Sequence, residues 1–212
     1  MQIPTEVQVR PGTEADLEAL TDIYNHYVRE TALTFDTAAF TRDERLPWLR
    51  SHPEDGPHRL LVALDPGTRV NAPHVLGYAT SSPYRPKAAY STSVEVSVYC
   101  APDAVGRGVG TLLYKELFEA LAGEDLHRAY AAIALPNEPS VRLHDAFGFR
   151  HVGTYTEVGR KFGRYWDVAW HEKPLLSRTA PQGEPPSAGP RGEPPLSRTA
   201  PSASPDPSRS RR

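Results

Sequence analysis

Apolar residues recur at helical spacing near the start of the chain and predict a first amphipathic helix. Its apolar face comprises Leu17, Leu20, Ile23, Tyr24, Tyr27 and Val28. Thr13 precedes this helix as a candidate N-cap, and acidic residues occupy its first turn. A short strand over 7–10 is expected before the helix. The polar stretch 31–57 follows it and predicts one further short helix.

Short apolar runs in the middle of the chain predict strands. Residues 60–64 form a buried-strand pattern that is closed by a turn at 65–67, and residues 75–80 follow as the second strand of a hairpin. A loop over 81–91 leads to a Val- and Thr-rich strand over 92–99. Strands are also expected over 128–135, 151–157 and 164–171.

Two helices are predicted between these later strands. They cover 111–122 and 140–147, and Gly148 stands at the C-terminal cap position of the second. The predicted order is therefore strand, helices, three strands, helix, strand, helix and two strands. This order indicates an α/β fold around one mixed sheet.

Composition divides the chain into two segments. Nine of the 22 prolines fall within 177–212, where the only large apolar residue is one Leu. Such a segment has little to bury, so we expect a disordered Pro/Arg/Ser-rich tail. The tail repeats Leu-Ser-Arg-Thr-Ala-Pro and Gly-Glu-Pro-Pro imperfectly, and a passive solubilising role is favoured over a binding role. Residues 1–176 are expected to form one domain.

Charge and cysteine content exclude several classes of protein. The tail carries six arginines against three acids, so the remainder is acidic and does not suit nucleic-acid binding. One cysteine allows no internal disulfide, and the start of the chain lacks the pattern of a signal peptide. The longest apolar run, 129–135, is too short to span a bilayer. We therefore expect a cytoplasmic protein without a nucleic-acid or membrane partner.

A Gly-rich turn carries the first chemical signal. The strand ending at Tyr99 leads into Val105-Gly106-Arg107-Gly108-Val109-Gly110-Thr111, directly before a helix. Glycines at such a turn let backbone N–H groups approach an anion such as a pyrophosphate. A tight turn without a ligand would show the same glycines. The ending of a P-loop is missing, and no first βαβ unit surrounds the turn as a Rossmann fold requires.

A second motif, Pro136-Asn137-Glu138-Pro139-Ser140, also opens a helix, which ends in Gly148-Phe149. Together the two motifs resemble the GNAT N-acetyltransferase superfamily. Several further segments resemble its phosphinothricin N-acetyltransferase branch: 24–28, 90–99, 135–137, 140–144 and 167–168. The resemblance covers roughly 7–176. It implies a mixed, mostly antiparallel central sheet flanked by helices on both faces.

The resemblance implies that Glu95 is the catalytic carboxylate, which takes a proton from the substrate ammonium directly or through water. Burial in a strand would raise the pKa of such a carboxylate, which suits a base near neutral pH. An outward-facing strand glutamate is the alternative. His144 matches the position of the family's tyrosine acid, where this branch has histidine. It could protonate the CoA thiolate, assist at Glu95, or be a satisfied core histidine.

The resemblance also implies where acetyl-CoA, the cosubstrate, would bind. Val98, Tyr99 and Cys100 would pair with the pantetheine arm as an added strand does, and an N–H near Val98 would face the developing oxyanion. The segment Gly106 to Thr111 would hold the pyrophosphate, and Asn137 the pantetheine amides. Family members usually carry Gln or Arg where this chain has Val105, so altered phosphate contacts are expected. Cys100 lacks a local histidine that would activate it as a nucleophile.

The loop before the catalytic strand holds Arg85, Lys87 and Tyr90, and the resemblance places amine recognition there, with Phe35 as a further pocket residue. Two cations beside aromatics suit a carboxylate and a second anionic group. The expected substrate is a small anionic amino acid such as phosphinothricin, methionine sulfone or methionine sulfoximine. The order of Arg and Lys is swapped relative to the phosphinothricin enzymes, which leaves the amine open.

Two alternatives remain beside this reading. One is a GNAT enzyme for a polyamine or a protein N-terminus, and the other is an acyl-CoA-binding module without turnover. No metal is expected, because the eight histidines show no metal-like spacing. The resemblance implies a homodimer.

Overall fold

The computed structural model of the protein describes residues 7–65 and 74–175. The predicted tail 177–212 and the turn residues Pro66 and Gly67 lie outside these ranges. The strands are β1 (Gln8–Pro11), β2 (Leu60–Asp65), β3 (His74–Pro83), β4 (Ser93–Cys100), β5 (Arg128–Ala134), β6 (Arg150–Lys161) and β7 (Arg164–Pro174). The helices are α1 (Leu17–Glu30), α2 (Arg42–Arg50), α3 (Val109–Leu121) and α4 (Glu138–Ala146), with 3-10 turns η1 (Glu14–Asp16), η2 (Ala88–Tyr90) and η3 (Pro102–Ala104).

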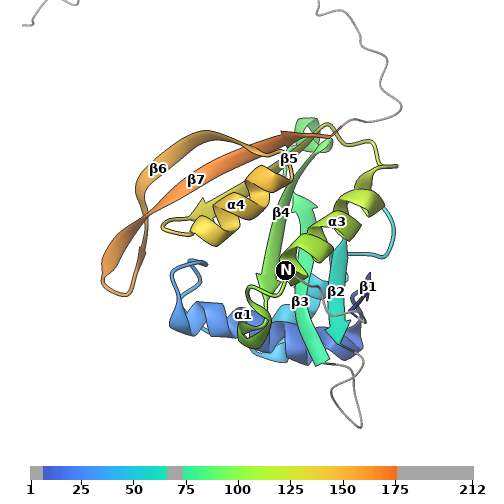
Figure 1. Cartoon of the computed structure of the whole chain (residues 1–212), viewed down its shortest axis with the longest axis horizontal. Coiled ribbons are helices and arrows are strands. Elements are labelled where there is room, and N and C mark those ends of the chain that lie inside the picture. Colours follow the sequence, from blue (N-terminus) through green and yellow to red (C-terminus); the bar gives the residue numbers. More distant parts are fainter. Residues whose placement is uncertain (1–6, 66–73, 176–212) are drawn as a thin grey trace, which may run out of the picture. The chain divides into compact units, whose positions relative to one another are not determined.

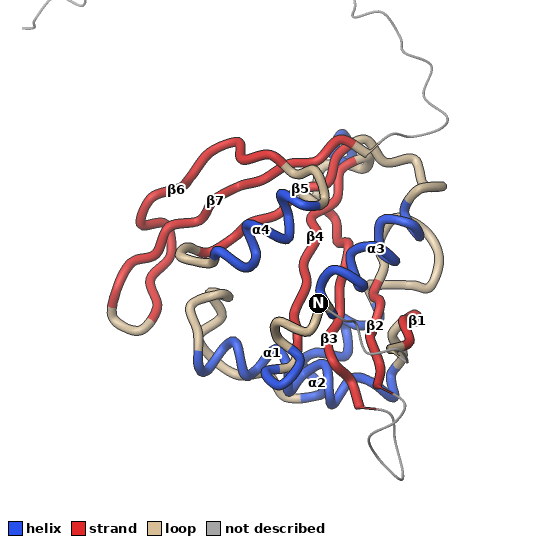
Figure 2. Tube along the Cα trace, in the orientation of Figure 1, coloured by secondary structure: helices blue, strands red, loops and turns tan. Residues whose placement is uncertain are grey.

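The seven strands form one sheet in the order β1-β2-β3-β4-β5-β7-β6 (Figure 2). Strands β4 and β5 run parallel, whereas the other neighbouring pairs are antiparallel. The expected mixed, mostly antiparallel sheet is therefore confirmed, as is the hairpin of β2 and β3. The last two strands form a hairpin that is longer than the sequence pattern predicts and curves away from the rest of the sheet (Figure 1).

A polar network holds the turn that leads into α1: Thr13, the predicted N-cap, precedes the 3-10 turn η1, and α1 begins at Leu17. The Asp16 carboxylate accepts hydrogen bonds from the Thr13 backbone N–H at 2.8 Å and from its hydroxyl at 2.9 Å. Arg10 of β1 pairs with the same carboxylate at 2.8 Å. These contacts hold the pKa of Asp16 below its usual value although burial opposes the shift. The first helix is thereby tied to the edge of the sheet.

Side chains of β4 alternate between the two faces of the sheet, and helices cover both faces. The Tyr99 ring contacts the rings of Tyr24 and Tyr27 on α1, at centroid distances of 5.3 Å and 5.2 Å. A Cβ built at Gly110 of α3 would lie 3.8 Å from the Val98 side chain and 3.9 Å from the Cys100 sulfur. Odd-numbered residues of β4 therefore face α1, and even-numbered residues face α3.

The core forms where these layers meet. Leu113, Tyr114 and Leu117 of α3 are fully buried on one face, and Leu17 and Leu20 of α1 are fully buried in the same apolar cluster. Burying a leucine side chain stabilises a fold by about 1.5–3 kcal/mol before entropic costs. This packing holds α1 and α3 against the two faces of the sheet at its centre.

Candidate active site

Strands β4 and β5 separate in the middle of the sheet. Their register covers Ser93–Glu95 against Arg128–Tyr130, and the rest of each strand lies beyond this pairing. Figure 1 shows the two strands diverging, with the start of α3 beside the widening gap. Glu95 is thus the last β4 residue before the gap.

Backbone polar groups of both strands are directed into this gap. Ala101 N–H donates to the Leu76 carbonyl at 2.8 Å, so odd-numbered β4 residues direct their backbone groups to β3. Since backbone directions alternate along a strand, the N–H and C=O groups of Val96 and Val98 point toward β5. Leu135 N–H donates to the Asp167 carbonyl at 2.9 Å, so Ala132 and Ala134 direct theirs toward β4 by the same argument.

A cavity of about 380 Å³ lies at this gap. Its lining includes Tyr27 and Leu33 from the α1 side and Tyr114, Leu143 and His144 from the side of α3 and α4. The cavity therefore passes through the sheet between the separated strands. An extended ligand with amide groups, such as a pantetheine arm, fits this arrangement because it can pair with both strand edges.

The predicted cofactor residues gather around this cavity. Its lining contains Val98, Tyr99, Cys100, Gly106, Gly108, Gly110, Thr111 and Asn137. Gly106 and Gly108 have φ of 78° and 84°, a left-handed conformation that favours glycine. Arg107 and Val109 belong to the same turn but are not part of the lining, and the Val109 side chain is buried in the core. The N–H groups at the start of α3 suit an anionic pyrophosphate.

Asn137 is the N-cap of α4. Its side-chain oxygen accepts a hydrogen bond from Ser140 N–H at 3.3 Å. The amide nitrogen of the same side chain can still donate to a ligand carbonyl. The structure thus gives Asn137 a structural contact and a position in the cavity wall at once.

Glu95 lies at the vertex of the gap, on the face of the sheet that α1 covers. Its side chain is 31% exposed, and Arg85 Nη1 lies 3.8 Å from its Oε2. Burial raises the pKa of Glu95, and the Arg85 charge partly opposes the rise. A carboxylate in this state can accept a proton near neutral pH.

Aromatic rings hold Arg85 beside Glu95. The guanidinium lies 4.4 Å from the centroid of the Tyr84 ring and 5.5 Å from that of Trp170. Tyr90 contacts Tyr84 at a centroid distance of 5.7 Å, so it joins the same cluster. Lys87 is exposed at the start of η2. The structure therefore brings Glu95 and Arg85 together, with Tyr90 in the adjoining aromatic cluster.

His144 lies on the opposite face from Glu95. Its side chain is 3% exposed; Nδ1 donates to the Ser140 carbonyl at 2.8 Å, which leaves Nε2 to accept from the Tyr114 hydroxyl at 2.9 Å. Burial lowers the pKa of His144, so the neutral ring is favoured. The two predicted catalytic residues are thus separated by the sheet, with the gap between them.

Cys100 is a poor nucleophile in this setting. Burial raises the pKa of its thiol to about 11, and the backbone N–H of Gly110 partly opposes the rise. Its carbonyl accepts a hydrogen bond from the Tyr27 hydroxyl at 2.7 Å. Since the thiolate is the reactive form, the thiol stays unreactive near neutral pH.

Several residues of the cavity wall were not predicted from the sequence. They are Tyr27, Leu33, Val96, Ser97, Val105, Tyr114, Ala131, Ala132, Ile133, Ala134, Pro139, Ser140 and Leu143. The small side chains at 131, 132 and 134 are the one signal that could have pointed to the gap, because they leave room for a ligand beside β5. Phe35, predicted for the amine pocket, lies against Gly159 of β6.

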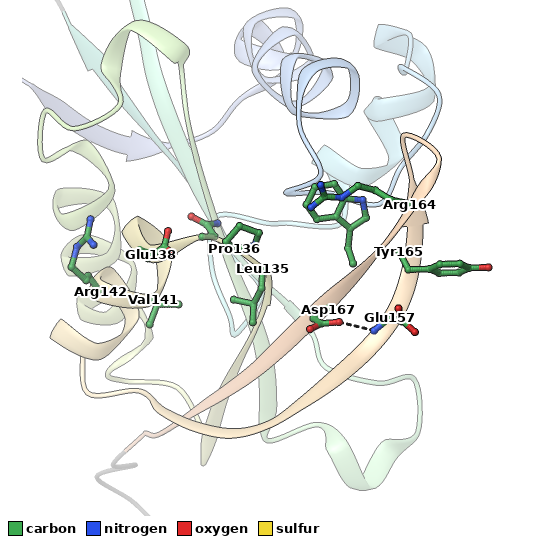
Figure 3. A pocket seen from close by; sticks show the side chains of 11 residues that line it. Leu135, Pro136, Glu138, Val141, Arg142, Glu157, Arg164, Tyr165 and Asp167 are labelled. Carbon is green, nitrogen blue, oxygen red and sulfur yellow. Dashed lines mark hydrogen bonds between the residues drawn. The ribbon is translucent and has the colours of Figure 1, made fainter.

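A second cavity, of about 630 Å³, lies between the start of α4 and the β6–β7 hairpin. Figure 3 shows Leu135, Pro136 and Glu138 on one side of it and Glu157 and Asp167 on the other, with the Tyr165 ring directed away. Asn137 is the one predicted site residue in its lining. The chemistry expected from the sequence therefore belongs to the cavity in the gap.

In the ranges 7–65 and 74–175, no three His, Cys, Asp or Glu side chains gather as a metal-ligand set. Within the same ranges, every helix is too short or too polar to cross a membrane.

Comparison with known proteins agrees with this geometry. Residues 9–170 match the model of the acetyltransferase (GNAT) domain. The chain belongs to the GNAT acetyltransferase family, and it is an N-acetyltransferase. It is 71% identical to a phosphinothricin N-acetyltransferase of Streptomyces coelicolor over 170 residues, 80% of this chain and 97% of that protein.

Two further relatives are more distant. An L-methionine sulfoximine/L-methionine sulfone acetyltransferase of Pseudomonas aeruginosa is 34% identical, over 82% of this chain and 98% of its own. The crystal structure of a phosphinothricin acetyltransferase from Sinorhizobium meliloti in complex with AcCoA is 30% identical, with a TM-score of 0.72, over 80% of this chain and 88% of that one. The family resemblance and the acetyltransferase class expected from the sequence are confirmed, so the non-catalytic module is set aside.

Proposed function

We propose that this enzyme transfers the acetyl group of acetyl-CoA to the α-amine of a small anionic amino acid. Phosphinothricin, methionine sulfone and methionine sulfoximine are the expected type. The observation that carries this proposal is the pairing of Glu95 with Arg85 at the vertex of the gap, 3.8 Å apart. A base and a guanidinium at this distance suit an ammonium and a carboxylate on neighbouring atoms of one substrate. The relatives named for such substrates support the same class.

The residues of the gap would hold acetyl-CoA, which supplies the activated acetyl thioester. Backbone groups of Val96 and Val98 would pair with the pantetheine arm, and the Asn137 amide nitrogen would donate to one of its carbonyls. N–H groups from Gly106 to Thr111 would bind the pyrophosphate. The Val98 N–H would stabilise the oxyanion of the reacting carbonyl.

Glu95 would take the proton of the bound ammonium, which leaves a lone pair for direct attack in a ternary complex. The raised pKa of Cys100 supports direct attack over an acetyl-cysteine route. His144 lies on the far face, which supports a role on the acetyl-CoA side over assistance at Glu95. In its neutral form it would hold the wall formed by Tyr114 and Ser140, and it could protonate the departing thiolate only after taking up a proton itself.

The test is release of free thiol from acetyl-CoA with a panel of amines. The panel contains phosphinothricin, methionine sulfone, methionine sulfoximine, common amino acids, a polyamine and a peptide with a free N-terminus. Turnover with the anionic amino acids, and weak turnover with their carboxamide derivatives, is expected. Preference for the polyamine or the peptide would replace the proposed substrate class. Acetylation of phosphinothricin would predict resistance to that herbicide in cells that express the enzyme.

We also propose that the enzyme acts as a homodimer in the cytoplasm. The β6–β7 hairpin exposes Val152, Tyr155, Val158, Phe162 and Tyr165, each between 44% and 58% exposed. Exposed apolar side chains gathered on one hairpin support a protein contact surface. Light scattering should give a dimer mass, and Tyr155→Glu should shift the mass toward the monomer. A monomeric wild-type protein would contradict the proposal.

The cytoplasmic location is supported by the cysteine content. A single cysteine cannot form an internal disulfide, which suits a reducing compartment.

A further inference from the structure

The end of the β6–β7 hairpin contacts the loop between α1 and α2. Lys161, the last residue of β6, is 4% exposed, and its ammonium donates to the Thr34 carbonyl at 2.7 Å. The Tyr27 carbonyl accepts from the same ammonium at 3.4 Å. In Figure 1 the hairpin end lies beside the segment that follows α1. A buried cation thus joins two parts of the chain that are far apart in sequence.

The surroundings of Lys161 act on its charge in opposite directions. Tyr27 lies in the last turn of α1, where exposed carbonyl groups give the helix end a partial negative charge. Burial lowers the pKa of Lys161, and the Asp36 carboxylate of the same loop partly opposes the shift. An apolar side chain at 161 would leave the Thr34 carbonyl without this donor. The ammonium is therefore held to the loop by its hydrogen bonds to the Thr34 and Tyr27 carbonyls.

The hairpin backbone is itself held firmly where Lys161 leaves it. The Trp166 ring N–H donates to the Lys161 carbonyl at 3.0 Å. Asp167 accepts a hydrogen bond from the Glu157 N–H at 2.7 Å across an irregular stretch of the hairpin (Figure 3). These contacts hold the backbone from which the Lys161 side chain extends.

An apolar contact accompanies the polar one. A Cβ built at Gly159 would lie 2.2 Å from the Phe35 ring, closer than real Cβ atoms come. Glycine at 159 therefore lets Phe35 pack directly on the hairpin. The same loop carries Leu33, which lines the cavity in the gap.

We infer that Lys161 is a positioning residue that holds the loop 31–41, so that Phe35 stays against the hairpin and Leu33 stays in the cavity wall. Gly159 is the matching contact on the apolar side. The kinetic part of this inference rests on the proposed amine site, because it assigns Phe35 to that site. The structural part does not depend on the amine.

The test compares Lys161→Met with Arg160→Met, a matched control whose exposed side chain lies over the Tyr165 ring. Hydrogen exchange of a peptide covering 31–41 is measured first, with no amine present. Losing one charge-assisted hydrogen bond should speed exchange there by ~10-fold in Lys161→Met and leave the control unchanged. Equal exchange in both variants would overturn the inference.

Kinetics with the amine that the panel identifies gives the second measurement. Lys161→Met should raise the KM for the amine by ~10-fold with kcat changed much less. The same substitution in a Phe35→Ala background should add little, because both act through one loop. If Lys161→Met still raises the KM by ~10-fold in the Phe35→Ala background, Lys161 does not act through Phe35 and the inference is overturned. A fall in kcat with an unchanged KM would overturn it as well. If Lys161→Met fails to fold, Lys161→Gln replaces it in both measurements. If no amine is turned over, the proposed substrate class fails, and the exchange result decides the role of Lys161 by itself.

Discussion

Replacing Glu95 by Gln removes the proposed base and its charge pair with Arg85, and leaves the shape of the side chain nearly unchanged. The two side chains have nearly the same shape, and Glu95 sits at the end of the β4–β5 pairing, outside the cavity lining. A positioned general base contributes about 10²–10⁴ in rate. Because 31% of the Glu95 side chain is exposed, water can reach the amine and replace part of its action. We therefore expect kcat to fall about 100-fold, or about 2.7 kcal/mol at 1.36 kcal/mol per tenfold.

The pH profile gives a second signature of the same change. Only the deprotonated carboxylate can accept the proton, so wild-type activity is present above the pKa of Glu95 and is lost as the pH falls through it. Burial raises that pKa, which moves the loss toward neutral pH. The Gln variant has no such group, so its residual activity should lack this acid limb. The difference between the two enzymes should therefore narrow at low pH.

The assay is thiol release at saturating acetyl-CoA, with acetyl-CoA affinity measured separately by calorimetry. Affinity for acetyl-CoA should stay within about threefold of wild type, because Glu95 lies outside the cavity lining. A threefold change corresponds to less than about 1 kcal/mol. A variant that keeps more than a third of wild-type kcat, or that keeps the acid limb, would refute the assignment of Glu95 as the base.

Substitutions at four further positions test the site and its frame. Arg85→Met should raise the KM for anionic amines about 10-fold and move the acid limb to higher pH, since Arg85 lowers the pKa of Glu95; a limb that moves to lower pH would contradict this. Asn137→Asp should weaken acetyl-CoA binding and preserve thermal stability, whereas Asn137→Ala should reduce both, because only the first keeps the capping oxygen. Cys100→Ser should retain turnover in the thiol assay, and a loss of 100-fold or more would revive an acetyl-cysteine route. Gly77→Ala should destabilise the fold by about 1–3 kcal/mol in denaturant titrations, because its Cβ would lie 2.7 Å from the Tyr99 carbonyl oxygen.

Local patterns were sufficient to predict most of the elements. The apolar face of 17–28 predicted α1, and the glycine after Phe147 marked the end of α4, where Gly148 has a φ of 80°. The Gly-rich turn over 105–111 was also recognised from a short motif, and Gly106, Gly108, Gly110 and Thr111 line the cavity, whereas its role toward acetyl-CoA stays a prediction. Each of these signals is contained within a short segment.

Other features depend on contacts that a short segment does not encode. Strands β4 and β5 pair only over Ser93–Glu95 and Arg128–Tyr130, and nothing in the apolar pattern of either strand marks where this pairing ends. Strand alternation puts Glu95 on one face, but the arrangement of the helices decides that His144 is on the other. Lys161 meets Thr34 across 127 residues of sequence, and no periodicity predicts that contact.

The parting of β4 and β5 also links folding to the supply of cosubstrate. In the ligand-free chain, the backbone groups of Val96, Val98 and Ala132 that face the gap must be satisfied by solvent. A ligand that takes them over binds the native state and not the unfolded one, so the free energy of unfolding rises with its concentration. At a free concentration of 100 times Kd the gain is about 2.7 kcal/mol. The level of acetyl-CoA in the cell would then govern how long each enzyme molecule persists, as well as how fast it works.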